Sequence, residues 1–512
     1  MAVTEQVHSK PTVALPTMRR FLVASVVVGV ALGGQLALDA GHSWSALTLF
    51  VAAVTGWAWL QARTSHTTLL GKPAYMPALP ELLAAQPSQA GIRLGAFTRS
   101  HVLSVLGALL GAAAVGLAVW NWLVLDVTKA GDGDWLRYVA TVLLFLTGAL
   151  VIELGRPRTS RCGDKADTKA GSQQAVTWVL AAIVALAAGL RLWNLDGLPF
   201  GTWYDEAANG LETLRILREP TYRPIYTDGV NSTGHYLFLI AAAFQLFEPN
   251  TFAVRLVSAL MGIATVVAAY FFGKELHSPT LGLFLAFFMA VARWSITFSR
   301  LGMYNMATPL FELVVLVFLL RGLRRGSVLD FSLAGVGVGL GLCFYSAFQL
   351  FLPVLAVGGL WLALAGGRWR ARGQWARLLT GAVIALVAAA LVIAPVVKYA
   401  LEKPDSYFAR VQKTSLFSGK EPEERLPALW TNTHKHLLMF NVRGDANGRH
   451  NLPGAPMLDW VTGGLFVLGL GMCAVRLRDP AALLGPVWIA TGLLGGILSL
   501  DFEAPRSLRS IG

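Results

Sequence analysis

The sequence of 512 residues contains few charged residues. Charged residues make up 14% of the chain, hydrophobic residues make up 55%, and the mean hydropathy is +0.57. A soluble domain normally carries about 25% charged residues, so this composition excludes an ordinary soluble protein. Cysteine is scarce as well. Cys162, Cys343 and Cys473 are scattered along the chain, which indicates neither a disulfide framework nor a metal cluster.

Long apolar runs dominate the sequence, and a helix needs roughly 20 such residues to cross a hydrocarbon core. The runs lie near residues 20–38, 46–62, 102–125, 137–153, 175–192, 252–272, 280–298, 306–321, 329–345, 347–366, 378–398, 457–475 and 481–500. A membrane β-barrel would show short alternating segments instead. The sequence therefore predicts an all-α, polytopic integral membrane protein with about 13 transmembrane helices. The first run follows Arg19 and Arg20, as in a signal peptide, but "ALDAGH" is a weak cleavage site and we expect a retained anchor.

The net charge of +13 raises the possibility of nucleic-acid binding. The basic residues, however, lie in short loops between apolar runs, for example within 156–169, 321–326 and 368–377. This distribution is the positive-inside pattern of membrane proteins. We therefore expect a multi-pass protein of the plasma membrane, with the lipid bilayer and no nucleic acid as a partner.

The segment 236–247, "YLFLIAAAFQLF", is apolar but too short to span a bilayer comfortably. If it did span, the basic loops that follow would lie outside, so we interpret it as a re-entrant or interfacial helix. The loops 193–235, 299–305 and 344–349 then lie on the outer face. The loop 399–456 lies there too, because long loops cross largely regardless of charge.

The sequence contains no P-loop, and no G-x-G-x-x-G opens a helix after a strand. ATP and nucleotide sugars are cytoplasmic, whereas the polar loops of this chain are expected outside. An enzyme that faces outward must draw an activated substrate from the membrane.

The stretch "GTWYDEAANG", residues 201–210, places two acids side by side in an outer loop. Asp205 and Glu206 stand at the start of a predicted helix, where the helix dipole favours acids. From spacing alone, a catalytic role and a helix-start role are equally open. The flanking Trp203 and Tyr204 are suited either to sugar or lipid contact or to an interfacial aromatic anchor.

Three longer stretches carry a resemblance to a known family. They are "GTWYDEAANGLETLRIL", "HYLFLIAAAFQLFEPNTFAVRLVSALMGIATVVAAYFFGKEL" and "SITFSRLGMYNMATPLFELVVLVFLLRGL". In this order they resemble the N-terminal half of the GT-C fold transferases that use polyprenyl-phosphate sugars, nearest to the family 39 protein O-mannosyltransferases and similar bacterial enzymes. Residues 439–459 also resemble a loop of the bacterial members. The resemblance covers about 175–512.

The resemblance implies a glycosyltransferase that moves a mannose-like sugar from a polyprenyl-phosphate donor to a protein or lipid acceptor, with inversion, on the extracytoplasmic face. Asp205 is then the general base. Glu206 is expected to orient one of three groups: the acceptor, an arginine side chain or a cation. Arg300 is the expected contact of the donor phosphate. Further expected substrate contacts are His235, Tyr304, Asn305, Tyr345, Trp203 and Tyr204. No metal ligand is implied, although a divalent cation remains open.

The expected domain organisation has two parts. Residues 1–170 form an N-terminal extension with about four spans, and residues 171–512 form the GT-C-like core with the outer loop 399–456. Family members usually continue beyond the point that corresponds to Gly512, so a truncated core is one expectation. Arg255 lies inside an apolar run and is expected to pair with a buried partner. His434, His436, Asp445 and Asn447 are weak candidates for metal binding.

Other functions remain alternatives. A related transferase could move another sugar to a lipid. A glycoside hydrolase would need a second carboxylate across the site, which Asp501 or Glu503 could supply. A transporter would need charged or broken helices at mid-membrane and an internal repeat, neither of which is evident in the sequence. A membrane scaffold without chemistry would not need the acids or Arg300.

Overall fold

The computed structural model describes residues 15–64, 94–156, 167–364, 372–476 and 480–511. The chain divides into two compact units. One contains Met1–Pro77 and Leu458–Pro486, and the other contains Ala78–Met457 and Val487–Gly512. The first unit covers less of the chain than the expected extension 1–170, and the division of the chain at residue 170 remains a prediction.

The smaller unit is built from three apolar helices, α1 (Leu15–Asp39), α2 (Ser43–Thr64) and α18 (Trp460–Val475). Its core contains Val27, Ala31, Ala53 and Leu468. A side chain at Gly471 of α18 would lie 2.2 Å from Val54 Cγ2, so glycine is needed for this close packing. Two helices from the start of the chain thus pack against one from near its end.

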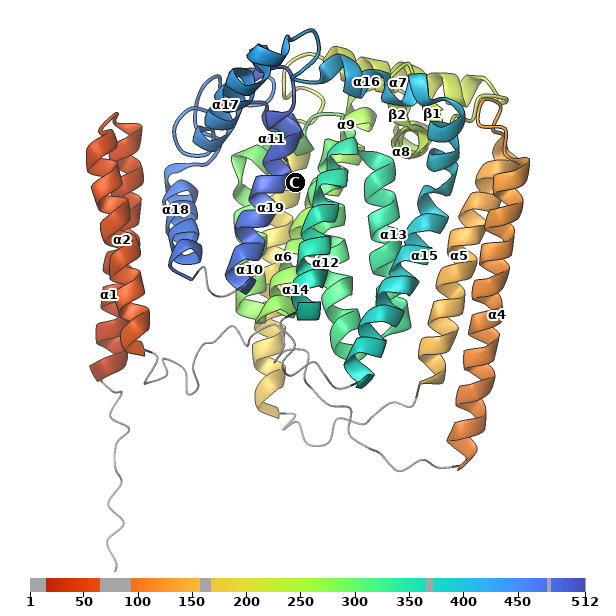
Figure 1. The fold of residues 1–512 in the computed structure, drawn as a ribbon, viewed down its shortest axis with the longest axis horizontal. Coiled ribbons are helices and arrows are strands. Elements are labelled where there is room, and N and C mark those ends of the chain that lie inside the picture. The colour runs from red at the N-terminus through yellow and green to blue at the C-terminus, as the bar shows by residue number, and fades with distance from the viewer. Residues whose placement is uncertain (1–14, 65–93, 157–166, 365–371, 477–479, 512) are drawn as a thin grey trace, which may run out of the picture. The chain divides into compact units, whose positions relative to one another are not determined.

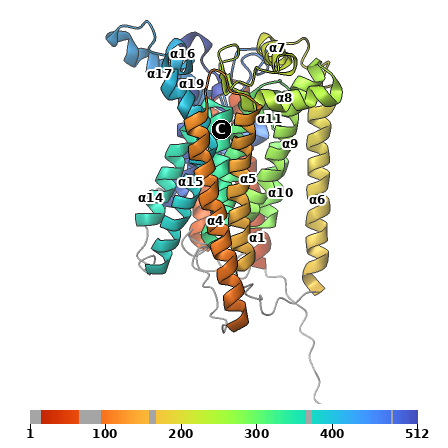
Figure 2. The same ribbon diagram turned by 90° about the vertical axis from the view of Figure 1, so that its right-hand side faces the viewer.

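The larger unit consists mostly of long helices that run alongside one another (Figure 1). They are α4 (Leu94–Val124), α5 (Asp132–Gly155), α6 (Asp167–Leu192), α9 (Thr251–Leu276), α10 (Pro279–Val291), α11 (Arg293–Ser299), α12 (Ala307–Arg325), α13 (Val328–Phe344), α14 (Leu352–Leu364), α15 (Arg372–Glu402) and α19 (Pro480–Ile497). Figure 2 shows α4 and α5 side by side. Small residues permit the close contacts: a side chain at Gly148 of α5 would lie 2.6 Å from the Gly107 carbonyl oxygen of α4.

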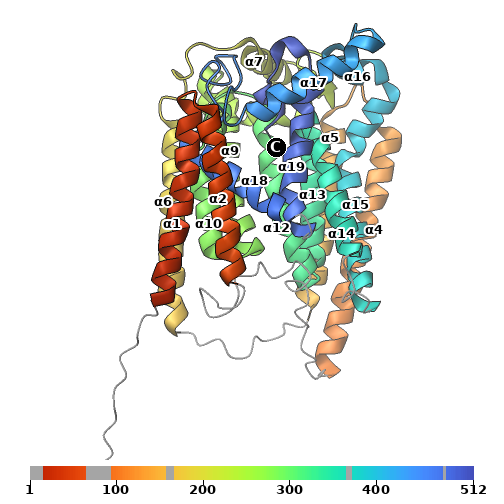
Figure 3. The same ribbon diagram turned by 60° about the vertical axis from the view of Figure 1, so that its left-hand side comes forward.

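Shorter elements gather at one end of this unit in all three ribbon views (Figures 1, 2 and 3). They are α7 (Tyr204–Arg218), α8 (Gly234–Phe247), α16 (Pro404–Thr414) and α17 (Pro422–Leu438), with the antiparallel strands β1 (Tyr226–Thr227) and β2 (Ser232–Thr233). The described residues also contain the 3₁₀ helices η1 (Tyr304–Met306) and η2 (Ser346–Phe351), which precede α12 and α14, and η3 (Asp501–Glu503) and η4 (Ser507–Arg509), which follow α19. This end carries the loops that the sequence predicts on the outer face.

The predicted fold class is confirmed, but the number of spans is not. Among the described residues, eight helices are long and apolar enough to cross a membrane, or nine if α10 and α11 form one span bent by 60°. The runs 329–345, 347–366, 457–475 and 481–500 form shorter apolar helices. The segment 236–247 lies in α8, which has 14 residues and is below the usual length of a span.

A hydrophobic core joins the short helix α8 to the neighbouring long helices. It contains Tyr236 and Ile240 of α8, Phe298 of α11, Met306 of η1 and Val257 of α9. Because these residues come from several helices, the core fixes α8, the segment 299–306 and α9 relative to one another. The two ends of α9 have clear sequence signals: Asn250 caps the start by accepting from Ala253 N at 2.8 Å, and Lys274 lies in the last turn.

Candidate active site

The first turn of α7 presents its two acids in different directions. Trp203 has an extended backbone before the helix, and its N–H donates to Glu206 Oε2 at 3.0 Å. Consecutive residues on a helix point about 100° apart. The Asp205 side chain is consequently 29% exposed, whereas that of Glu206 is 1% exposed. Of the pair, only Asp205 is accessible to an acceptor.

Glu206 forms a buried ion pair with Arg255 of α9. Arg255 Nε lies 2.9 Å from Glu206 Oε1, and the Gly302 N–H donates to the same oxygen at 2.7 Å. Burial alone would raise the pKa of Glu206, but the Arg255 bonds and the backbone N–H donors hold that pKa below its usual value. Glu206 is thus the buried partner expected for Arg255. It orients an arginine, which is one of its predicted roles, and fixes α7 to the core.

Asp205 is oriented by an arginine from a distant loop. Arg449 Nη1 lies 3.1 Å from Asp205 Oδ2. The Arg449 guanidinium also lies over the Trp203 ring at 4.8 Å and near the Tyr204 ring at 6.0 Å. Burial lowers the pKa of Arg449, and the charge of Asp205 opposes that shift. The predicted aromatic pair therefore helps to hold the arginine that contacts the predicted base.

Two tyrosines connect Asp205 with a second group of arginines. The rings of Tyr304 and Tyr345 lie 5.5 Å apart. Tyr304 is close enough to Asp205, Arg410 and Arg509 for their charges to act on its hydroxyl group. Interaction with Tyr304, and then with Tyr345 and Asp205, raises the pKa of Arg410. Asp205, Tyr304 and Tyr345 therefore lie in one region of the structure, together with Arg410 and Arg509.

Arg410 and Arg509 form a positively charged pair without a carboxylate partner in the described part of the chain. Arg410 Nη1 donates to the Val230 carbonyl at 3.5 Å, and Arg509 Nη1 donates to Ser499 Oγ at 3.0 Å. Burial lowers the pKa of Arg509, and the nearby charges of Arg506 and Arg410 act in the same direction. Two half-buried guanidinium groups that repel each other favour the binding of an anion.

Arg300 occupies a different environment from the one expected. Its guanidinium donates to the carbonyl oxygens of residues at the end of α6 and in the loop that follows: Leu190, Arg191, Trp193, Asn194 and Leu198. The residue is 9% exposed. Cations favourably bind the free carbonyls at a helix C-terminus. This geometry favours a structural role for Arg300 over contact with a phosphate.

His235 and Asn305 both lie beside the hydrophobic core. The ring nitrogens of His235 lie 3.1 Å from Thr233 Oγ1 and 3.1 Å from Tyr138 Oη. Burial lowers the pKa of His235 to about 4, so the ring is neutral near pH 7. Asn305 is 1% exposed, and neither polar atom of its side chain has a hydrogen-bond partner within the described residues.

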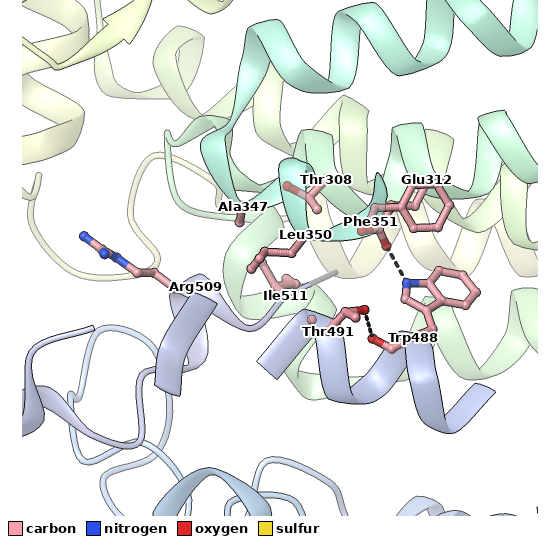
Figure 4. Close-up of a pocket in the computed structure, with 10 residues that line it drawn as sticks. Thr308, Glu312, Ala347, Leu350, Phe351, Trp488, Thr491, Arg509 and Ile511 are labelled. Carbon is pink, nitrogen blue, oxygen red and sulfur yellow. Dashed lines mark hydrogen bonds between the residues drawn. The ribbon is translucent and has the colours of Figure 1, made fainter. Parts of the chain in front are cut away.

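A small cavity lies beside Arg509 (Figure 4). Thr308, Glu312 and Trp488 line the part of it that lies within the helices, and Trp488 Nε1 donates to Glu312 Oε2 at 3.0 Å. Glu312 is 3% exposed within the span of α12. The interpretation that no charged or broken helix lies in the membrane is thus wrong, since α12 carries Glu312 and the α10–α11 pair is bent.

The last residues of the described chain are held in place by the loop after α17. Asp445 accepts from the Ser507 N–H at 3.0 Å and from Ser507 Oγ at 2.6 Å, and it contacts His450 Nδ1 at 3.2 Å. The carboxylate considered for metal binding thus positions η4, which contains Arg509. The acids proposed for a hydrolase are also paired, Asp501 with Lys420 and Glu503 with Arg506.

Sequence reasoning missed Arg410, Arg449 and Arg509. Arg410 and Arg509 lie in stretches that contain no recognisable motif. Their positive charge in a predicted outer loop was the only signal that could have identified them. Arg449 lies in the stretch 439–459, which resembled a loop of bacterial relatives but suggested no role for any residue.

One comparison with known proteins bears on this site. A family model described as "Dolichyl-phosphate-mannose-protein mannosyltransferase" matches residues 235–396, which is less than half of the chain. No curated protein matches the chain. The matched segment contains Tyr304 and Tyr345 but not Asp205 or the three arginines that surround them. Over residues 235–396 the chain thus matches, as predicted, the membrane glycosyltransferases of the mannosyltransferase type, which have the GT-C fold.

Proposed function

We propose that this protein transfers a mannose-like sugar from a polyprenyl-phosphate donor to a hydroxyl group of a protein or lipid acceptor on the extracytoplasmic face of the plasma membrane. The observation that carries the proposal is the position of a partly exposed carboxylate, Asp205, whose charge acts on Arg410, with Arg509 beside Arg410. Within the described residues neither of these arginines forms an ion pair with a carboxylate. Tyr304 links the two groups, because the charges of Asp205, Arg410 and Arg509 all act on its hydroxyl group.

Asp205 is the proposed general base. One carboxylate oxygen contacts Arg449, and the exposed part of the group is available to an acceptor hydroxyl. The carboxylate takes the hydroxyl proton while the oxygen attacks the anomeric carbon. Attack on the side opposite the leaving phosphate inverts the configuration, so a β-linked donor yields an α-glycoside. Arg449 keeps the carboxylate in one orientation during this step.

Arg410 and Arg509 are the proposed ligands of the carrier phosphate. The bond from the anomeric carbon to the phosphate oxygen breaks, and the phosphate gains negative charge. Guanidinium groups match phosphate geometry and stabilise that charge as it develops. Tyr345 lies near Arg509 and Arg410 and is a further proposed phosphate contact. This assignment replaces Arg300, whose guanidinium already donates to main-chain carbonyls.

A transfer assay tests the proposal. Purified protein in nanodiscs is given radiolabelled polyprenyl-phosphate mannose, and separately other lipid-linked sugars, with membrane protein and lipid extracts as acceptors. Label that moves to protein, and is lost in Asp205→Asn, supports protein glycosylation. Label that moves to lipid identifies the alternative acceptor. No transfer from any donor, in this chain and in a version extended at its C-terminus, would refute the proposal.

A further inference from the structure

Helix α17 carries a stripe of apolar side chains that no described residue of the larger unit covers. Leu426, Trp430 and Leu437 are 73%, 72% and 60% exposed. Their spacing of four and seven residues places them within about 40° of one another around a helix with 100° per residue. We call these three residues the α17 stripe. Such a patch marks a surface of interaction rather than a surface in water.

The buried side of α17 attaches the helix to the end of α19. Asn432 and His436 are both 0% exposed. Asn432 Nδ2 donates to the carbonyls of Ile497 and Ser499 at 3.0 and 2.9 Å. His436 Nε2 accepts from the Arg506 N–H at 3.0 Å. The orientation of α17 is therefore fixed by the last turn of an apolar helix and by the segment that follows it.

This attachment places α17 at the level where the apolar helix α19 ends. The apolar helix α19 ends at Ile497, and the carbonyl of that residue is the one that Asn432 binds. Leu494 and Leu498 near the same end are 36% and 41% exposed. The apolar surface thus continues from the end of α19 to a helix held beside it, as the upper part of Figure 3 shows for α17 and α19.

We propose that the α17 stripe lies in the interface between the bilayer and water, so that α17 is a surface-lying helix anchored by lipid. The occupant is the headgroup and upper acyl region of the membrane that the protein already crosses. Tryptophan and leucine on one side of an amphipathic helix are typical of this position. A different side of α17, formed by Asn432 and His436, contacts the Ser499 carbonyl and the Arg506 N–H, so the bilayer supports the segment that carries Arg509.

Spin-label accessibility tests the proposal without an activity assay. The full chain, with its three cysteines replaced by alanine, is placed in liposomes of phosphatidylcholine and phosphatidylglycerol. Labels are attached separately in Leu426→Cys and Trp430→Cys, and in the controls Glu424→Cys and Thr431→Cys. The control residues are exposed and lie on the other side of the same helix. We expect the labels in the stripe to collide with oxygen more than with a water-soluble nickel chelate, and the control labels to show the reverse.

Two other results would overturn the proposal. If a label at position 430 meets the nickel chelate as often as one at position 431, the stripe faces water. If labels at positions 426 and 430 meet neither reagent, protein covers the stripe, either the unit of α1, α2 and α18 or a second copy. Because two positions in the stripe are labelled independently, one variant that fails to fold leaves the test intact.

Discussion

Asp205 and Arg449 are separated by 244 positions in the sequence, yet their side chains meet at 3.1 Å. Asp205 belongs to the first turn of α7, and Arg449 belongs to the loop that follows α17. The contact joins the two polar regions that lie at the same end of the helical bundle. It also leaves part of the carboxylate exposed, which a catalytic base requires and a purely structural ion pair does not.

The first prediction concerns Asp205. Asp205→Asn should keep the protein folded in the membrane but lower the rate of transfer by about 10²–10⁴-fold, because the amide cannot accept the acceptor proton. Single-turnover transfer from labelled donor measures the effect. Asp196→Asn is the matched control, since Asp196 is an exposed aspartate in the loop just before α7. Full activity in Asp205→Asn would exclude the role of general base.

The second prediction concerns the two arginines without carboxylate partners. Arg410→Ala and Arg509→Ala should each weaken the donor complex by roughly 10–100-fold, since a hydrogen bond to a charged group contributes about 1.5–3 kcal/mol. Titration with a fluorescent polyprenyl phosphate measures the affinity. Arg425→Ala removes an exposed arginine of α17 as a control. Unchanged affinity in both site variants would place the phosphate elsewhere.

The third prediction concerns Arg300, for which the sequence predicts contact with the donor phosphate and the geometry of the structure favours a structural role. Its side chain donates to five carbonyls around the end of α6, so Arg300→Ala should lower the melting temperature of the protein in detergent. Arg300→Lys should recover only part of the loss, because an ammonium group cannot reproduce the guanidinium fork. An unchanged melting temperature together with weaker donor binding would restore the phosphate role predicted from the sequence.

The buried pair of Glu206 and Arg255 should behave as a coupled unit. Removal of one partner, in Glu206→Leu or Arg255→Met, leaves an unpaired buried charge and should destabilise the protein by about 3–5 kcal/mol. The double variant should lose less than the sum of the single losses. Thermal unfolding of all four proteins at pH 7 measures the coupling. Additive losses would show that the two side chains do not stabilise each other.

The sequence predicted the fold class well because membrane insertion is encoded locally. The apolar residues of each run are sufficient to predict a membrane helix without reference to the rest of the chain. Every predicted run from 20–38 to 481–500 lies in or overlaps a helix. The number of spans does not follow from the apolar runs alone, since α13 and α18 are shorter than a bilayer requires and the α10–α11 pair is bent. Length alone does not decide such cases.

The candidate site was predicted only in part, because its members are joined by tertiary contacts. The acid pair stands out in the sequence of an outer loop, and the resemblance implies its role, whereas Arg449 reaches Asp205 across 244 positions. Arg300 shows the opposite error. Its position beside the motif suggested phosphate binding, but the carbonyls that it binds come from residues 190–198, which no local pattern reveals.

The last prediction concerns the pH dependence of stability through His235. Burial lowers its pKa to about 4 in the folded protein, below the value of about 6.5 expected in an unfolded chain. Between these values the unfolded state binds more protons, so the contribution of His235 is complete above about pH 6.5 and declines as the pH falls to 4. His235→Gln keeps hydrogen-bonding groups near Thr233 and Tyr138 without titrating. We therefore expect the wild-type melting temperature to fall more steeply than that of His235→Gln between pH 6.5 and 4, whereas parallel curves would show that His235 takes up its proton equally in both states.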